Sequence, residues 1–188
     1  MKHLCIRLIA GGLIALAATH AAWAQKVKLD TSEGTIVLEL DREKAPKTVD
    51  NFLGYVRAGH YEGVIFHRVI ENFMIQTGGI KPDLSEKPTK PPIPLESRNG
   101  LSNVRGSVAM ARTSVPNSAT AQFFINVADN AFLDQPNARD GEGYAVFGKV
   151  IQGIEVVDRI RAMPTQAAGM QQNLPVKPVI IKKATVEK

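Results

Sequence analysis

The chain contains very little cysteine and tryptophan, with one of each in 188 residues, Cys5 and Trp23. Both lie within the first 24 residues, so the rest of the chain has neither. The lack of cysteine after residue 24 excludes a thiol nucleophile and a zinc site with cysteine ligands from that part. A fold formed by residues 25–188 therefore depends on its apolar core and on no disulfide.

Histidine is also scarce, and the usual catalytic motifs are missing. His60 and His67 are the two histidines after residue 24, and nothing near them has metal-ligand spacing. The sequence has no Gly-x-Ser-x-Gly motif and no glycine-rich phosphate-binding loop, and its acidic residues are scattered. The sequence therefore lacks the residues that hydrolysis, metal catalysis and nucleotide chemistry require. We expect no metal and no cofactor.

The charge of the chain is weakly basic and shows no basic run. The formal net charge is +5, and Lys2 and Arg7 lie in the first 24 residues, which leaves +3 for the remainder. Such a small excess favours solubility and gives no electrostatic footprint for nucleic acid. We therefore expect no nucleic-acid partner.

The first 24 residues have the pattern of a secretory signal peptide. Lys2 and Arg7 give a positive start, residues 8–18 are an apolar run, and residues 22–24 (Ala-Trp-Ala) form an A-x-A cleavage site. The alternative is a transmembrane anchor, but this run falls short of the ~20 apolar residues that a spanning helix needs. We therefore expect cleavage after residue 24, export to the periplasm, and no stable membrane association.

The remaining segment, residues 25–188, has the length of one ordinary domain and no linker that would divide it. Alternating apolar residues in two runs, 26–30 and 35–40, predict a β-hairpin. Pro46, followed by an apolar stripe at helical spacing, predicts a helix that ends at Gly59.

The rest of the domain reads as short elements and one long loop. Five prolines in residues 82–94 predict an irregular surface loop over residues 81–95. We also predict a helix over 154–162 and strands over 64–70, 73–77, 107–111, 122–126, 145–150 and 179–186. Many short strands with two helices indicate a mainly β fold, namely a closed antiparallel barrel.

Two segments carry the strongest functional signal. The first, FHRVIENFMIQTGG over residues 66–79, and the second, MARTSVPNSATAQFFIN over residues 110–126, resemble in order the signature segments of the cyclophilin family of peptidyl-prolyl cis/trans isomerases. The resemblance extends over nearly the whole chain after residue 25. It implies an eight-stranded barrel capped by two α-helices, and an enzyme that accelerates rotation about Xaa-Pro bonds.

Such a reaction suits a chain that lacks the usual catalytic motifs and metal-binding residues, because no bond is made or broken. The barrier of ~18–20 kcal/mol comes from amide resonance, which is lost when the prolyl nitrogen becomes pyramidal. A fixed donor aimed at that nitrogen binds the twisted state better than either planar state. Arginine suits this role because it stays charged and its fork is rigid. The resemblance assigns the role to Arg68, whereas spacing alone would also allow an exposed strand arginine in a salt bridge.

The resemblance also assigns the pocket for the proline ring. It places Phe73, Met74, Phe124 and Leu133 there, although apolar strand residues of this kind are also typical of barrel core. Phe123 and Phe124 are adjacent on a predicted strand and must face opposite sides. We therefore expect Phe123 in the barrel and Phe124 in the pocket.

Four further residues match polar and backbone-binding positions of the family. We expect Gln76 to orient Arg68 and bind the substrate backbone, and Gln122 to border the pocket, although either could be a plain surface amide. Ala111 and Arg112 match the segment that binds the residue before proline through its main chain. Many relatives have Asn at the position of Arg112, and the charge here would favour acidic partners.

At two aromatic positions the sequence differs from many eukaryotic cyclophilins, and the difference concerns the binding of cyclosporin, an inhibitor of the family. Phe132 stands where eukaryotic cyclophilins commonly carry a Trp whose indole N–H donates to cyclosporin, and Tyr144 stands where they commonly carry a His. Because Phe has no donor, we predict weak cyclosporin binding with catalysis largely kept. With the signal peptide, both departures resemble the bacterial periplasmic branch.

The sequence thus predicts a monomeric periplasmic prolyl isomerase that acts on proline-containing segments of unfolded or flexible exported proteins. Slow proline isomerisation limits the folding of many chains. The alternative is a chaperone-like module that binds such segments without turning them over. A third possibility is a barrel that serves only protein–protein contact, which would have no need of the combined Arg68, aromatic and glutamine set.

Overall fold

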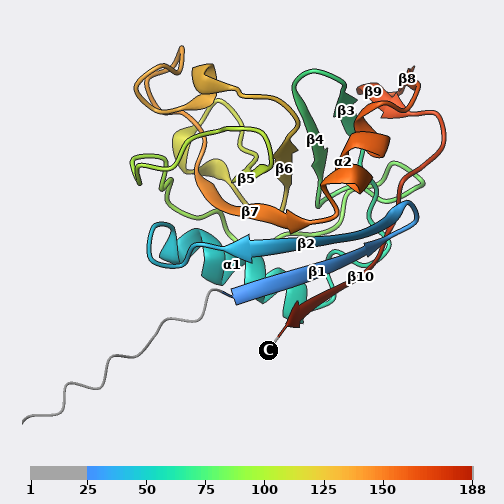
Figure 1. Ribbon diagram of the computed structural model, residues 1–188, viewed down its shortest axis with the longest axis horizontal. Helices are drawn as coiled ribbons and strands as arrows, with labels where there is room; N and C mark the ends of the chain where they lie inside the picture. The colour runs from blue at the N-terminus through green and yellow to red at the C-terminus, as the bar shows by residue number, and fades with distance from the viewer. Residues whose placement is uncertain (1–24, 188) are drawn as a thin grey trace, which may run out of the picture.

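The computed structural model describes residues 25–187 (Figure 1). Its ten strands, two α-helices and two 3-10 turns are β1 (Gln25–Thr31), β2 (Gly34–Leu40), α1 (Pro46–Arg57), β3 (Arg68–Ile70), β4 (Met74–Thr77), β5 (Ser107–Met110), η1 (Pro116–Ser118), β6 (Phe123–Asn126), η2 (Ala131–Leu133), β7 (Val146–Gln152), α2 (Ile154–Arg161), β8 (Thr165–Ala168), β9 (Gln171–Pro175) and β10 (Ile181–Glu187). The predicted signal peptide lies outside the described residues. No helix within residues 25–187 is long and apolar enough to cross a membrane.

The predicted hairpin is confirmed. Strands β1 and β2 pair antiparallel from Gln25 opposite Leu40 to Thr31 opposite Gly34. The Thr31 hydroxyl closes the turn by donating to the carbonyl of Gly34 at 2.6 Å. Gly34 has a φ of 132°, a conformation that side chains rarely adopt, so the turn needs glycine there.

Eight strands form one curled sheet in the order β10-β1-β2-β7-β5-β6-β4-β3. Figure 1 shows it curving from β10, β1 and β2 at the bottom of the view to β4 and β3 at the top. The mainly β class is therefore correct, but the closed barrel is not confirmed, because no ladder joins the edge strands β3 and β10.

The open side of the sheet also explains why the strand predicted over residues 64–70 is shorter than expected. Only Arg68–Ile70 pairs as a strand. The preceding residues make separate backbone bonds to the segment before β10, such as Phe66 N–H to the Val179 carbonyl at 2.9 Å. These bonds span the gap between the edges without forming a continuous ladder.

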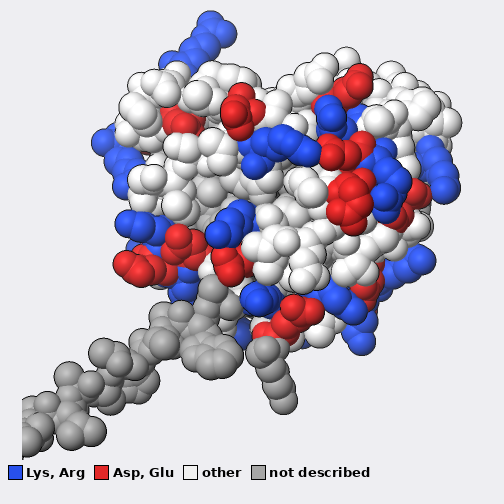
Figure 2. Space-filling model, viewed as in Figure 1, with Lys and Arg blue, Asp and Glu red and all other residues white. Residues whose placement is uncertain are grey.

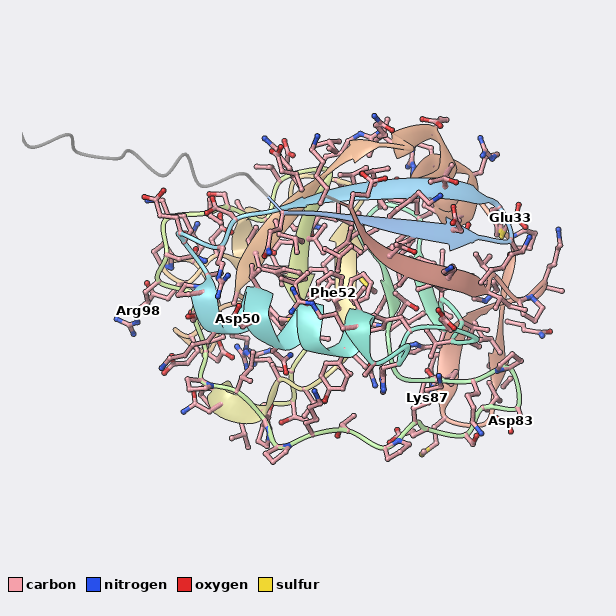
Figure 3. The ribbon with its side chains drawn as sticks, turned by 90° about the horizontal axis from the view of Figure 1, so that it is seen from below. Glu33, Asp50, Phe52, Asp83, Lys87 and Arg98 are labelled. Atoms are coloured by element: carbon pink, nitrogen blue, oxygen red, sulfur yellow. The ribbon has the colours of Figure 1, made fainter. Side chains whose placement is uncertain are left out.

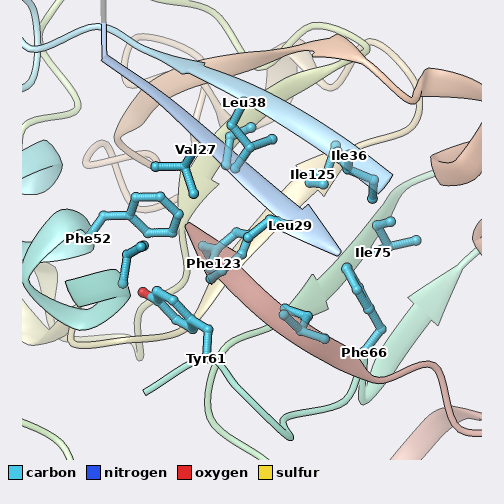
Figure 4. Packing of buried hydrophobic residues seen from close by; sticks show 14 of the residues in the cluster. Val27, Leu29, Ile36, Leu38, Phe52, Tyr61, Phe66, Ile75, Phe123 and Ile125 are labelled. Atoms are coloured by element: carbon cyan, nitrogen blue, oxygen red, sulfur yellow. The ribbon is translucent and has the colours of Figure 1, made fainter. Parts of the chain in front are cut away.

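The main core lies between the concave face of the sheet and α1. Helix α1 begins at Pro46, as predicted, and ends at Arg57, two residues before the predicted end at Gly59. It points Phe52 toward the strands (Figure 3). The Phe52 ring packs edge-on against Phe123 at 5.2 Å between centroids (Figure 4). The centroid of the Phe147 ring lies 5.1 Å from that of Phe52. Burial of such large rings is the main source of stability for a chain of this size.

The C-terminal third contains a hairpin that the sequence did not predict. After the predicted helix α2, strands β8 and β9 pair through a turn at Gly169, which has a φ of 56°. These strands are rich in Gln and Ala and poor in β-branched residues, so they lack the usual strand signal. The hairpin lies against the edge strand β3.

The proline-rich segment 81–95 is irregular, as predicted, but it is held to the body of the protein. The Lys87 ammonium donates to the carbonyls of His60 and Glu62, both at 2.7 Å. The Lys90 N–H donates to the Tyr55 hydroxyl at 2.8 Å. Figure 3 shows Lys87 beyond the C-terminal end of α1.

Candidate active site

The site is built on the short β3–β4 ladder. Arg68 and Gln76 are direct partners across these strands, so their side chains emerge on the same face. The Arg68 guanidinium donates to the Gln76 side-chain oxygen at 3.4 Å, and the Gln76 amide donates to the Gln122 oxygen at 2.8 Å. The structure thus brings together the cation and the two glutamines that the sequence analysis singled out.

An apolar cup lies next to this polar row. It consists of a second cluster of buried side chains, separate from the main core, with partly buried aromatic residues around it. The buried members are Met74, Ala109, Phe124, Leu133 and Val146, with Ile70, Phe73, Leu101, Ala111 and Tyr144 packed against them. Phe123 belongs to the main core and Phe124 to the cup, as strand alternation predicts.

A cavity of about 530 Å³ joins the cup to the polar row. Its walls include ten of the predicted site residues, which are Arg68, Phe73, Met74, Gln76, Ala111, Arg112, Gln122, Phe124, Leu133 and Tyr144. A larger cavity of about 650 Å³ lies between β2, β7 and residues 101–107, and it contains none of them. We place the site in the smaller cavity because Arg68, the two glutamines and the apolar cup converge there.

Phe132 is the predicted site residue that does not line the cavity. Its side chain is 58% exposed, and its ring stacks on Phe73 with centroids 5.6 Å apart. Phe132 therefore extends the rim of the cup through Phe73.

Four further residues line the cavity that were not predicted from the sequence. They are His67, Ile80, Glu86 and Gln171. His67 and Ile80 lie inside or beside the first signature segment, so their proximity to Arg68 was the available signal. Glu86 comes from the proline-rich loop and Gln171 from the β8–β9 hairpin, and no local pattern points to either.

Arg112 is not the free cation that its sequence position suggested. Its side chain is 1% exposed, and it donates to the Asp140 carboxylate at 2.5 Å and to the Gly143 carbonyl at 2.8 Å. Its guanidinium also lies over the Tyr144 ring, 4.6 Å from the centroid. Asp140 thus offsets the charge on which the expected preference for acidic partners rests, and that preference stays a prediction.

Asp140 is strongly held in its ionised form. The hydrogen bond from Arg112 and those from the backbone N–H groups of Glu142 and Gly143 lower its carboxyl pKa from 3.8 to about 2. The same bonds shape the turn that leads into Tyr144. Asp140 and Arg112 therefore hold one aromatic wall of the cup in place.

His67 lies beside Arg68 and is neutral at pH 7. Burial, reinforced by the positive charge of Arg68, lowers its pKa from 6.5 to about 4. The His67 imidazole therefore adds no charge to the site. Arg68, which is exposed and 5.9 Å from the centroid of the Phe73 ring, supplies the cation at the edge of the cup.

No group of three His, Cys, Asp or Glu side chains in residues 25–187 is placed to hold a metal ion. On the face shown in Figure 2, basic and acidic side chains are interspersed. The cavity thus offers the Arg68 cation, a row of amides and an apolar cup, and its walls also include the Glu86 carboxylate and the Arg112 side chain that is paired with Asp140. These suit a neutral polypeptide segment that carries a small apolar ring.

Comparison with known proteins points to one family. Residues 26–186 match the model of the cyclophilin type peptidyl-prolyl cis-trans isomerases. The chain is 56% identical over 161 residues to "Peptidyl-prolyl cis-trans isomerase cyp18" of Streptomyces antibioticus, covering 85% of this chain and 97% of that protein. It is 52% identical over 161 residues to peptidyl-prolyl cis-trans isomerase B of Escherichia coli, covering 85% and 98%.

Solved structures agree with the sequence comparison. A cyclophilin type peptidyl-prolyl cis-trans isomerase of Cryptosporidium parvum superposes with a TM-score of 0.73 at 26% identity, over 88% of this chain and 99% of that one. A crystal structure of the same protein in the presence of the dipeptide Ala-Pro gives a TM-score of 0.72 at 27% identity, over 87% and 99%. The similarity therefore covers the whole curled sheet.

Proposed function

The chain belongs to the family of cyclophilin-type peptidyl-prolyl cis-trans isomerases and is such an enzyme, and on that premise we propose that Arg68 is its catalytic residue and the apolar cup its proline-binding pocket. The single observation that supports this assignment is the position of Arg68. It stands at the edge of the cup beside Phe73, and Gln76 accepts a hydrogen bond from it. A proline ring in the cup would present its nitrogen toward this guanidinium.

The proposed mechanism is differential binding of the twisted amide. In the planar states the prolyl nitrogen shares its lone pair with the carbonyl group, and it is a poor acceptor. As the bond twists, the lone pair localises on nitrogen and Arg68 can donate to it. Each ~1.4 kcal/mol by which this hydrogen bond favours the twisted state raises the rate about tenfold. Apolar neighbours strengthen the interaction by keeping water away.

The proposed substrates are Xaa-Pro segments of flexible or unfolded polypeptides. The apolar cup suits the pyrrolidine ring, and the amides of Gln76 and Gln122 suit the main chain on either side of it. The crystal structure of the Cryptosporidium parvum relative in the presence of the dipeptide Ala-Pro supports an Xaa-Pro segment as the ligand. We propose that the natural clients are exported proteins that refold in the periplasm.

The decisive experiment compares the protein starting at Gln25 with its Arg68→Ala and Arg68→Lys variants. Exchange NMR on a short Xaa-Pro peptide would give the cis–trans rate, and peptide titration would give Kd. We expect both variants to keep Kd within about threefold and to lose about 10²–10³-fold in rate, as when one donor to a transition state is removed. Lys keeps the charge but loses the planar fork.

Two other outcomes would revise the proposal. Peptide binding without acceleration by the unaltered protein would favour a non-catalytic module that binds proline-containing segments. Full activity in Arg68→Ala would leave the assignment as a prolyl isomerase intact, but it would show that Arg68 is not the catalytic residue.

The cellular location needs its own experiment. We propose export on the evidence of the N-terminal pattern in residues 1–24. Expression of the full chain in a bacterium, followed by mass spectrometry of the periplasmic fraction, should give a protein that begins at Gln25. A full-length protein in the cytoplasmic fraction would overturn this proposal.

A further inference from the structure

A chain of buried amides lies directly behind the apolar cup. Asn126 and Asn130 are 0% and 3% exposed, and the Asn130 amide donates to the Asn126 oxygen at 2.7 Å. The Asn126 amide in turn donates to the Ser107 hydroxyl at 2.9 Å and to the Asn103 oxygen at 3.2 Å. We call Asn103, Asn126 and Asn130 the amide network.

The network touches the cup at two of its walls. The Asn130 side chain donates to the Phe73 carbonyl at 2.8 Å, and the Asn130 carbonyl accepts from the Leu133 N–H at 2.8 Å. Asn126 lies on β6 two residues after Phe124, so it is on the same face of that strand as the cup. The network therefore joins the backbones that carry Phe73, Phe124 and Leu133.

A further set of bonds anchors the network to the neighbouring loop. The Asn103 backbone and side-chain amides both donate to one Asp134 carboxylate oxygen, at 2.7 and 2.9 Å. The Asn130 N–H donates to the Asn103 carbonyl at 2.7 Å. The segment of residues 130–134 is thus held at both ends against Asn103.

Apolar residues at these positions would fill the same volume without the cost of burying three amides. A buried amide network can position the groups around it, because hydrogen bonds are directional and each one defines the relative position of the two groups it joins. Small displacements of a binding wall weaken a ligand that fits it closely. The arrangement therefore suits a device that defines the shape of the cup.

We propose that Asn130 and Asn126 are positioning residues that set the width of the cup by holding Phe73 against Phe124 and Leu133. This inference rests on the proposed function, since it assumes that the cup binds the proline ring. The network contacts the cup and makes no hydrogen bond to Arg68. Its loss should therefore weaken substrate binding and leave the rate of the bound peptide nearly unchanged.

The test is Asn130→Ala, measured by peptide titration and by exchange NMR at saturating peptide. We expect Kd to rise about five- to tenfold and the rate at saturation to stay within about twofold. Asn130→Ser keeps one donor that can serve only one of the two acceptors, and it should give an intermediate Kd. If Asn130→Ala does not fold, Asn130→Ser is used for the same measurements in its place.

The matched control is Thr48→Val on α1. Thr48 is 1% exposed, and its hydroxyl donates to Glu96 at 2.7 Å, so the variant also loses a buried polar contact, but one outside the cup. We expect it to lower thermal stability and leave Kd unchanged.

An unchanged Kd in folded Asn130→Ala, or an equal rise in Thr48→Val, would overturn the positioning role. A fall in the rate at saturation with normal Kd would also overturn it. Failure of the unaltered protein to bind or accelerate the peptide would instead refute the proposed function, so the two failures are distinguishable.

Discussion

The side chain of Gln76 lies between Arg68 and Gln122 and hydrogen-bonds to both. Its oxygen accepts from the Arg68 guanidinium at 3.4 Å, and its amide group donates to the Gln122 oxygen at 2.8 Å. Both ends of the amide are therefore engaged before any substrate arrives. This relationship supports the prediction that Gln76 orients the Arg68 guanidinium.

Replacement of this amide should reduce catalysis without altering the fold. In Gln76→Ala the Arg68 guanidinium loses its acceptor and can rotate away from the cup. We expect kcat/KM to fall about tenfold, which corresponds to about 1.4 kcal/mol of transition-state stabilisation. Gln122→Ala is the control, because it leaves the Arg68–Gln76 bond in place and should lose less activity. An equal loss in both variants would assign the effect to substrate contact by the glutamine pair.

His67 should make stability depend on pH while activity stays flat near neutrality. Its folded pKa of about 4 lies below the ordinary 6.5, so the unfolded state binds the proton first as pH falls. The stabilisation is fully present above pH 6.5 and is lost progressively toward pH 4, by up to about 3 kcal/mol. Urea unfolding at several pH values should show this slope in the unaltered protein and a shallower one in His67→Phe. Parallel slopes for the two proteins would contradict the expectation, as would a step in kcat/KM between pH 6 and 8.

The contact between Asp140 and Arg112 should matter for the Tyr144 wall. Asp140→Asn removes the carboxylate that neutralises the buried Arg112 charge, and it weakens the turn before Tyr144. We expect peptide Kd to rise about two- to fivefold in the variant. Because the folded pKa of Asp140 is about 2 and its ordinary value is 3.8, the stabilisation holds above pH 3.8 and is lost between pH 3.8 and 2. Titrations at pH 7 and unfolding curves at low pH would check both parts, and Asp83→Asn, in the surface loop, is the control for the titrations.

Cyclosporin affinity should report on the rim of the cup. Phe132 is exposed and stacked on Phe73, so a larger ring can be placed there without disturbing the core. We expect weak binding by the unaltered protein. Phe132→Trp should bind about fivefold more tightly, because one added hydrogen bond is worth about 1 kcal/mol. Calorimetric titration of both proteins gives the comparison, and tight stoichiometric binding by the unaltered protein would refute the prediction. Peptide turnover should differ little between them.

Much of the fold follows from local pattern. The alternation in β1 and β2, the Pro46 start of α1 and the split of Phe123 and Phe124 between core and cup were predictable, because side-chain direction in a strand or helix depends only on spacing. The ends of the sheet were not predictable in the same way. Whether β3 meets β10 depends on the accumulated curl of eight strands, and no short segment encodes that.

The same distinction between local pattern and tertiary contacts applies to the site. The sequence by itself determined which side chains are available: two arginines, two glutamines and a set of apolar residues in two signature segments, with no cysteine after residue 24. Only the tertiary structure decided that Arg112 is neutralised by Asp140, that Phe132 lies outside the cavity, and that Gln171 reaches it. The physical reason is that charge pairing and exposure arise from contacts between residues far apart in the chain, and spacing along the sequence carries no record of them.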